Sequence, residues 1–252
     1  MKKLMAANWK MFKVREDAKT TALALAGLIE GKVPEDREVL LIPALPSVGP
    51  VYEALGAGAR GILVGAQNVY PAEEGAFTGE VSPAMLKDLG AGHVLAGHSE
   101  RRHVLGEDDA FVGQKTAFGL AHGLTMILCV GEKIEERRAG DVEAVLTRQL
   151  EAGLADVPKD VPAERIVVAY EPVWAIGTGE VAGPAEIIEA HTFLRKMLRK
   201  LYGDKANEIR ILYGGSVKPS NCAEIIALDN VDGVLVGGAS LIAESFAEIV
   251  LA

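Results

Sequence analysis

Polar or glycine-rich residues that could do chemistry directly follow five short apolar runs. They are Asn8 and Lys10, His98 and Glu100, Glu171, the run 214–216, and the pair Gly237 and Gly238. A carboxylate, an imidazole and a lysine are suited to proton transfer, and glycine turns let backbone N–H groups approach a phosphate. The pattern predicts one site if the fold brings these five chain positions together.

The acid in this set, Glu171, ends the run 167–171 and precedes Pro172. A carboxylate that follows a buried strand is desolvated, so we expect its pKa to be raised toward the range of a general base. Pro172 favours extended geometry at Glu171. On position alone, a surface carboxylate that caps a loop is equally consistent.

His98 opens a polar run that extends to residue 102. If Ser99 and Glu100 begin a helix, their N–H groups place positive potential beside the imidazole, so we expect a lowered pKa and a neutral hydrogen-bond donor. Four other histidines lack such a setting and are assigned structural or surface roles: His93, His103, His122 and His191.

Lys10 is a cation at the end of the first apolar run, two residues after Asn8. In an acidic protein it could supply the local positive charge that an anionic ligand needs, although position alone favours a solvated lysine. Glu100 either holds Lys10 in place or pairs with Arg101 or Arg102 at the surface.

Three glycine-containing segments are candidates for phosphate binding. The runs 214–216 and 237–239 each follow an apolar run, and a helix that begins just after them favours negative charge. The segment 172–179 has proline at one end and Gly-Thr-Gly at the other, as expected of a lid with two hinges. An ordinary loop with Trp174 packed on the body of the protein is the alternative.

Eight apolar runs recur along the chain, and all are nearly continuous rather than alternating, which is typical of parallel strands buried on both faces. They span residues 4–9, 39–42, 62–66, 94–96, 126–130, 166–170, 209–213 and 234–236. Helical periodicity occurs between or after them, over residues 16–29, 142–154, 184–201, 221–228 and 241–251. These elements predict an α/β fold, a closed (β/α)8 barrel in one domain over residues 1–252, with its site at the carboxyl ends of the strands.

Composition limits the function. Lys+Arg 26 against Asp+Glu 35 gives a net charge of −9, which argues against a nucleic-acid or anionic-membrane partner. The apolar runs are too short to span a membrane. The two cysteines, Cys129 and Cys222, form no metal-ligand pattern and are expected to be buried thiols of a cytoplasmic protein.

Taken together, these residues resemble the triosephosphate isomerase family. The matching stretches run in the family's order from the first strand to the last: residues 8–10, 96–102, 170–179, 213–217 and 232–239. The resemblance implies a TIM barrel that interconverts dihydroxyacetone phosphate and D-glyceraldehyde 3-phosphate in glycolysis and gluconeogenesis, through an enediol(ate) and without metal or cofactor.

The resemblance also implies roles for single residues. Glu171 is the base, His98 is the neutral electrophile, and Lys10 and Asn8 stabilise the enediolate. Phosphate is bound through Gly177, Ser216, Gly237 and Gly238, under a lid made of Pro172, Val173, Trp174, Ala175, Ile176, Gly177, Thr178 and Gly179.

Three further positions take supporting roles in the resemblance. Cys129 lies beside the base although packing suffices to explain it, and Thr78 lies in a loop that reaches a partner subunit. Glu100 matches a family stretch, and the role considered for it above is to hold Lys10. A homodimer is implied, and a tetramer is possible. The segment 180–184 departs from many relatives, which leaves the motion of the lid's second hinge open.

Two other functions are compatible with the same residues. An aldolase would use Lys10 as a Schiff-base nucleophile, but such a lysine needs a lowered pKa, and the sequence offers the carboxylate of Glu100 instead. A phosphate-binding protein without activity would have no need of both Glu171 and His98.

Overall fold

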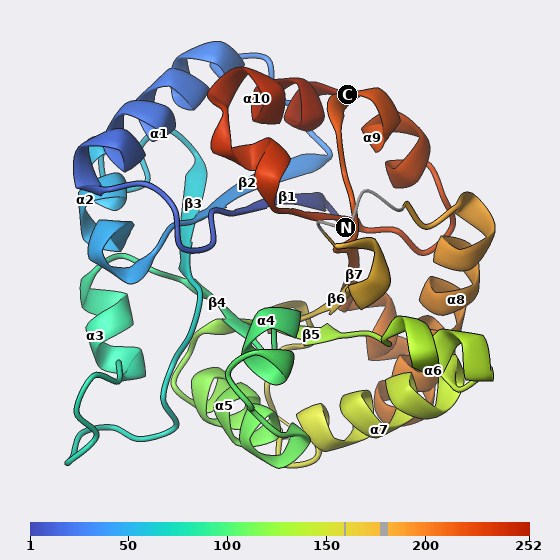
Figure 1. Cartoon of the computed structure of the whole chain (residues 1–252). Helices are drawn as coiled ribbons and strands as arrows, with labels where there is room; N and C mark the ends of the chain where they lie inside the picture. The colour runs from blue at the N-terminus through green and yellow to red at the C-terminus, as the bar shows by residue number, and fades with distance from the viewer. Residues whose placement is uncertain (159, 177–180) are drawn as a thin grey trace.

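Eight parallel strands close into a barrel in the order β1 to β8 (Figure 1). The structure is a computed structural model that describes residues 1–158, 160–176 and 181–252. The strands are β1 (Lys3–Asn8), β2 (Arg37–Ile42), β3 (Ile62–Ala66), β4 (His93–Ala96), β5 (Thr125–Val130), β6 (Ile166–Tyr170), β7 (Arg210–Tyr213) and β8 (Gly233–Val236). The predicted (β/α)8 barrel is confirmed, and each apolar run forms a strand.

The barrel closes because β1 pairs on both of its edges. Leu4 is in register with Glu38 of β2 on one side and with Gly233 of β8 on the other. β2 begins two residues earlier than its apolar run, because the backbone of Arg37 pairs with Lys3 although its side chain is polar.

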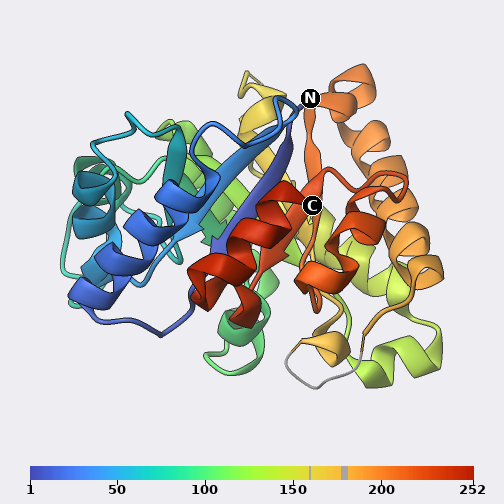
Figure 2. The same cartoon turned by 90° about the horizontal axis from the view of Figure 1, so that it is seen from above.

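Ten α-helices in the described residues surround the strands (Figures 1 and 2). They are α1 (Arg15–Ile29), α2 (Val48–Ala54), α3 (Pro83–Asp88), α4 (Ser99–His103), α5 (Asp109–Ala121), α6 (Ile134–Ala139), α7 (Val142–Leu154), α8 (Pro184–Tyr202), α9 (Pro219–Ile226) and α10 (Ala243–Leu251). The five helices predicted from periodicity all form, with ends shifted by at most two residues.

The long helix α5 was not predicted, because much of its buried face is made of small or polar residues. That face includes Gly113, Thr116, Gly119 and even Lys115, so little hydrophobic periodicity remains in the sequence. The helix nevertheless begins with a strong cap, in which the carboxylate of Asp108 accepts the N–H of Phe111.

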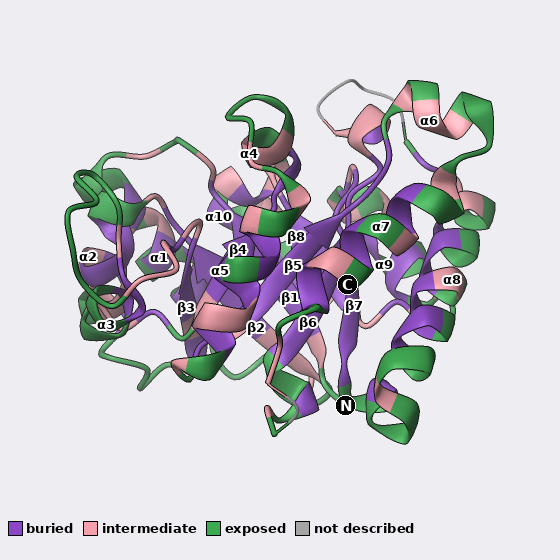
Figure 3. Ribbon diagram, turned by 90° about the horizontal axis from the view of Figure 1, so that it is seen from below, coloured by how far each residue is buried: buried purple, intermediate pink, exposed green. Residues whose placement is uncertain are grey.

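Alternate residues of each strand contribute to two separate apolar clusters. One fills the barrel and includes Leu4, Leu40, Ile127 and Leu212, whereas the other lies between the strands and the helices. Strands with two buried faces read as continuous apolar runs. Figure 3 shows this arrangement, with buried strands inside and exposed outer faces of the helices.

The two ends of the barrel differ. Figure 3 places α4 and α6 at one end and the N-terminus of the chain at the other. The first of these ends carries the carboxyl ends of the strands, where barrels of this kind place their active sites.

Candidate active site

A cavity of about 390 Å³ opens at the carboxyl ends of the strands. Its lining consists of Asn8, Lys10, His98, Glu171, Ile176, Gly214, Gly215, Ser216, Val217, Lys218, Leu235, Gly237, Gly238 and Ala239. The structure therefore brings together the acid, the imidazole, the lysine and both glycine runs, which come from β1, β4, β6, β7 and β8.

Glu171 and His98 form the centre of this cavity. Oε1 of Glu171 lies 3.0 Å from Nε2 of His98, and its Oε2 accepts the backbone N–H of Ser99 at 2.8 Å. Both residues are almost completely buried. The backbone beside Glu171 is packed so closely that a Cβ at Gly131 would lie 1.8 Å from the Glu171 carbonyl oxygen.

The ring of His98 is oriented by the helix that follows it. His98 is the N-cap of α4, and the backbone N–H of Glu100 donates to its Nδ1 at 3.3 Å. With Nδ1 as the acceptor, the hydrogen-bond geometry assigns the ring proton to Nε2, which points at Glu171. Ser99 is the first residue of this helix, so the condition of the argument about His98 is met.

The pairing of the two groups corrects both expectations about their pKa values. Burial lowers the pKa of His98, but the carboxylates of Glu171 and Glu100 together outweigh burial, and the net shift is upward. Burial likewise raises the pKa of Glu171, but His98, the Ser99 N–H and Lys10 together outweigh it, so the net shift is downward. The sequence argument treated each group alone, whereas in the structure each is the other's main electrostatic partner.

Lys10 enters the cavity from the turn that follows β1. Its Nζ lies 2.6 Å from Oε1 of Glu100, and its backbone N–H donates to Oδ1 of Asn8 at 3.0 Å. Of the two roles considered for Glu100, the structure places it against Lys10, because Arg101 pairs with Glu107 instead.

The two glycine runs line another part of the cavity wall. A Cβ at Gly237 would lie 3.2 Å from Cε of Lys10, so this glycine borders the lysine side chain. A 3-10 helix begins at Gly238, and its first N–H groups are therefore available to an anion. Ser216 and Lys218 line the same wall ahead of α9.

The segment expected to form a lid is only partly described. Gly177, Thr178 and Gly179 lie outside the described residues. Within the described part, residues 173–175 form a 3-10 turn, and Trp174 donates its indole N–H to Oε1 of Glu132 at 2.8 Å.

Two supporting positions have clear locations. Cys129 lies inside the barrel, where burial, followed by the charge of Glu171, raises its pKa well above the usual value. Its thiol is therefore neutral. Thr78 is exposed on the loop 67–82, which Figure 1 shows extending away from the barrel, and it does not line the cavity.

Sequence reasoning missed two polar residues at this end of the barrel. Glu132 is fully buried and accepts hydrogen bonds from Tyr170, Trp174 and Arg137. Gln67 directly follows β3 and donates to the backbone of Lys10. Both stand within two residues of a strand's carboxyl end, so the rule that selected the other residues could have found them.

The other histidines have the structural or surface positions expected of them. His191 is fully buried in α8, and burial lowers its pKa to about 4. His93 lies at the start of β4, where burial and then Arg210 lower its pKa to about 4 as well. None of the four lines the cavity.

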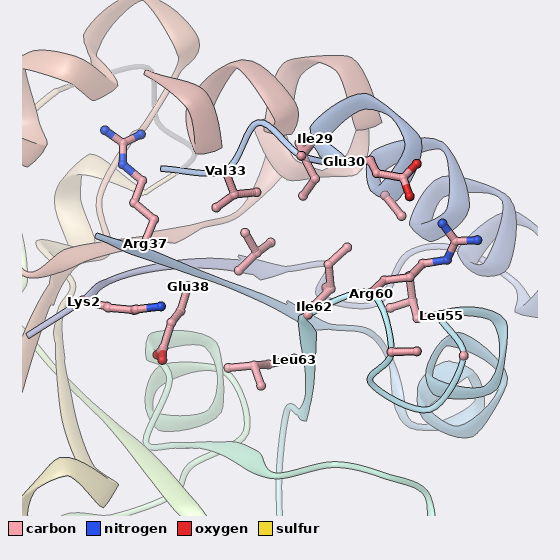
Figure 4. Close-up of a pocket in the computed structure, with 16 residues that line it drawn as sticks. Lys2, Ile29, Glu30, Val33, Arg37, Glu38, Leu55, Arg60, Ile62 and Leu63 are labelled. Atoms are coloured by element: carbon pink, nitrogen blue, oxygen red, sulfur yellow. The ribbon is translucent and has the colours of Figure 1, made fainter. Parts of the chain in front are cut away.

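A second cavity, of about 830 Å³, lies at the opposite end of the barrel (Figure 4). Lys2 and Glu38 stand at one side of it and Glu30 and Arg60 at the other, with apolar side chains between them. Its lining residues, all of them described, include no histidine and no cysteine. The end with the smaller cavity is therefore the one equipped for proton transfer.

Neither a metal centre nor a membrane-spanning helix is found in the described part of the chain. Among residues 1–158, 160–176 and 181–252, no three His, Cys, Asp or Glu side chains lie together as metal ligands would. In that same part, no helix has the length and apolar character required to cross a membrane.

Comparison with known proteins gives one consistent result. The family model described as triosephosphate isomerase matches residues 3–252. The triosephosphate isomerase of Nitratidesulfovibrio vulgaris (strain DSM 19637 / Miyazaki F) is 60% identical over 252 residues, with complete coverage of both chains. That of Lawsonia intracellularis is 50% identical and covers 99% of this chain and 98% of its own.

A solved structure agrees with these relatives. The crystal structure of triosephosphate isomerase from Bartonella henselae superposes with a TM-score of 0.88 at 39% identity, covering 99% of this chain and 98% of that one. With its barrel, its strand-end cavity and matches over its whole length, the chain belongs to the triosephosphate isomerase family.

Proposed function

We propose that this chain interconverts dihydroxyacetone phosphate and D-glyceraldehyde 3-phosphate, the reaction of its family, by proton transfer through an enediol(ate). The observation that carries the proposal is the placement of Nε2 of His98 3.0 Å from Oε1 of Glu171, in a cavity that also holds Lys10. A carboxylate base and an imidazole donor on one substrate are the groups that an aldose–ketose isomerisation requires.

Glu171 is the base that moves a proton between C1 and C2. In the structure its carboxylate is held by His98 and by the Ser99 N–H. A substrate oxygen that accepts the proton of Nε2 must take the place of Glu171 at that nitrogen. The carboxylate then loses the partner that lowers its pKa most, while burial, which raises the pKa, remains, and Glu171 becomes a stronger base.

His98 is the electrophile that hydrogen-bonds the substrate's carbonyl and hydroxyl oxygens. Once Glu171 is displaced, burial, which is the largest influence, and the charge of Lys10 lower the pKa of the ring, against the Glu100 carboxylate, which raises it. The N–H of Glu100 also favours the neutral Nδ1. Triosephosphate isomerases are the known example of a neutral imidazole in this role. The neutral donor expected from the sequence therefore applies to the complex with substrate.

Lys10 and Asn8 stabilise the negative charge of the enediolate. An ammonium group beside a developing oxyanion is worth more in a partly dehydrated cavity than in water. Backbone N–H groups at Gly237, Gly238 and Ser216 hold the phosphate. Gly177 is proposed for the same task, and residues 172–179 for the lid, on the strength of the sequence resemblance.

We also propose a homodimer, in which the loop 67–82 brings Thr78 to the partner's site. Support comes from exposed apolar side chains on the loops that follow β1 and β3, since Met11 is 93%, Phe12 56% and Phe77 42% exposed. Large apolar side chains exposed on loops at one end of the barrel are suited to a protein interface. We further propose that residues 1–252 form a single domain. We also propose a cytoplasmic location, which is supported by two buried free thiols.

Solvent deuterium exchange tests the chemistry directly. The native chain should incorporate deuterium rapidly at C1 of dihydroxyacetone phosphate, and exchange should collapse in Glu171→Gln. Glu151→Gln, on the half-exposed surface of α7, is the matched control and should exchange like the native chain. Equal exchange in the native chain and in Glu171→Gln would remove Glu171 from the role of base.

A further inference from the structure

The turn that carries Lys10 is conformationally strained. Lys10 has a φ of 51°, in the left-handed region that residues other than glycine rarely occupy. This conformation costs about 1 kcal/mol for a residue with a Cβ and persists only when neighbouring contacts impose it. One such contact is the hydrogen bond from the Lys10 N–H to Asn8.

The second contact on this turn comes from Gln67. Its Nε2 donates to the carbonyl oxygen of Lys10 at 2.7 Å and to that of Ile42 at 3.2 Å. Lys10 follows β1, Ile42 ends β2 and Gln67 follows β3, so one carboxamide joins the ends of three neighbouring strands. Both protons of its NH₂ group are used on backbone acceptors.

We propose that Gln67 is a positioning residue for Lys10. By fixing the peptide carbonyl of a strained turn, it directs the lysine side chain past Gly237 toward Glu100 and the cavity. Glutamine is suited to this task because its amide supplies two donors at the necessary reach, whereas glutamate supplies none. The inference rests on the role of Lys10 in the proposed function.

Gln67 also links Lys10 to the loop 67–82, of which it is the first residue. Oδ1 of the next residue, Asn68, accepts a hydrogen bond from Nζ of the buried Lys115 at 2.7 Å, and Lys115 also forms an ion pair with Glu107. The loop is therefore anchored on one side to the turn of Lys10 and on the other to α5. A displacement of the loop is transmitted to Lys10 through the Gln67 carboxamide.

A double-mutant cycle tests this role. Gln67→Met keeps the length of the side chain but removes both donors, and it is measured in the native chain and in the Lys10→Met background, in each case as kcat/KM on dihydroxyacetone phosphate. Gln149→Met is the control, because Gln149 likewise bridges backbone groups, the N–H and carbonyl of Gly131, but on the far side of the barrel.

We expect Gln67→Met to lower kcat/KM by about 10- to 100-fold in the native chain, since a displacement of about 1 Å of a catalytic group costs about that much. In the Lys10→Met background the same change should cost less than about threefold, because the group that Gln67 positions is gone. Gln149→Met should cost the same factor in both backgrounds. A loss below about threefold in the native chain, or an equal loss in both backgrounds, would overturn the proposal.

Two further measurements keep the result interpretable. If Gln67→Met does not fold, as judged by its thermal transition, Gln67→Leu replaces it, because leucine also lacks both donors and adds no charge beside Lys10. The native chain and Glu171→Gln are assayed beside them. Absence of isomerisation in the native chain would refute the proposed function, whereas an active native chain without coupling between Gln67 and Lys10 refutes this inference alone.

Discussion

The buried histidine of α8 makes this protein sensitive to acid. His191 is fully buried, its Nδ1 donates to the carbonyl oxygen of Asn230 at 2.9 Å, and its ring lies between those of Tyr170 and Tyr213. Within the described part of the chain, its Nε2 has no hydrogen-bond partner. A proton added there would produce a buried charge without a counterion.

The sign and the size of the effect follow from the pKa of His191. Burial lowers it from 6.5 to about 4 in the folded protein, whereas the unfolded chain takes up the proton near 6.5. The contribution to stability is therefore complete above pH 6.5 and is lost as the pH falls toward 4. Between about pH 7.5 and pH 5, only the about 1.5 pH units below 6.5 contribute. At about 1.4 kcal/mol per pH unit, His191 therefore lowers the free energy of unfolding by about 2 kcal/mol over this interval.

The assay is urea unfolding at several pH values and one protein concentration, because oligomerisation would otherwise shift the midpoint. His191→Gln retains an amide donor but does not titrate in this range. We expect the free energy of unfolding of the native chain to fall by about 2 kcal/mol more than that of His191→Gln over this interval. The control, His122→Gln on the partly exposed end of α5, should retain the native dependence. Parallel pH dependences for the native chain and His191→Gln would refute the reasoning.

Three further changes test other parts of the structure. Glu132→Gln weakens the acceptor that holds the indole of Trp174. We therefore expect a shift in tryptophan emission and about a tenfold fall in kcat/KM, and an unchanged emission spectrum would contradict this reasoning. Arg195→Met removes the donor of two carbonyl oxygens and the cationic partner of the partly buried Asp232 carboxylate, which keeps only the N–H of Ile211. Urea unfolding should show a loss of about 3 kcal/mol, and a loss below about 1 kcal/mol would contradict a stabilising role for this ion pair. Gly131→Ala forces a Cβ against the carbonyl of Glu171, so kcat/KM should fall by at least about tenfold, and native activity would mean that this end of β6 yields without moving the base.

The fold was predictable because its signal is local. Each strand packs on two faces, so all eight appear as apolar runs, and their ends were placed within two residues. The amphipathic helices α1, α7 and α8 were equally visible. Helices whose buried faces are short or polar were not visible in the sequence. Examples are α5, which buries Lys115, and the five-residue α4.

The site was predictable as a set of residues but not as a set of interactions. The rule that chemistry collects at strand ends selected Asn8, Lys10, His98 and Glu171, and the structure brings all four to one cavity. The directions of the pKa shifts were wrong because they depend on a contact between residues far apart in the chain, at a distance that no sequence pattern states. Gln67 follows β3 directly, so the strand-end rule could have selected it, but its hydrogen bonds to Lys10 and Ile42 could not be read from the sequence.

The two groups proposed to contact the substrate's oxygens, Lys10 and His98, differ in the hydrogen bonds that they already make. The ammonium of Lys10 has three donor protons, so it can keep its ion pair with Glu100 and still bind a substrate oxygen. His98 has one proton directed at the cavity, and Glu171 already accepts it. Substrate can therefore reach Lys10 without rearrangement, whereas it can reach His98 only by displacing the carboxylate. Displacement also releases Glu171 from the contact that weakens it as a base, so the same event that engages the electrophile prepares the proton acceptor.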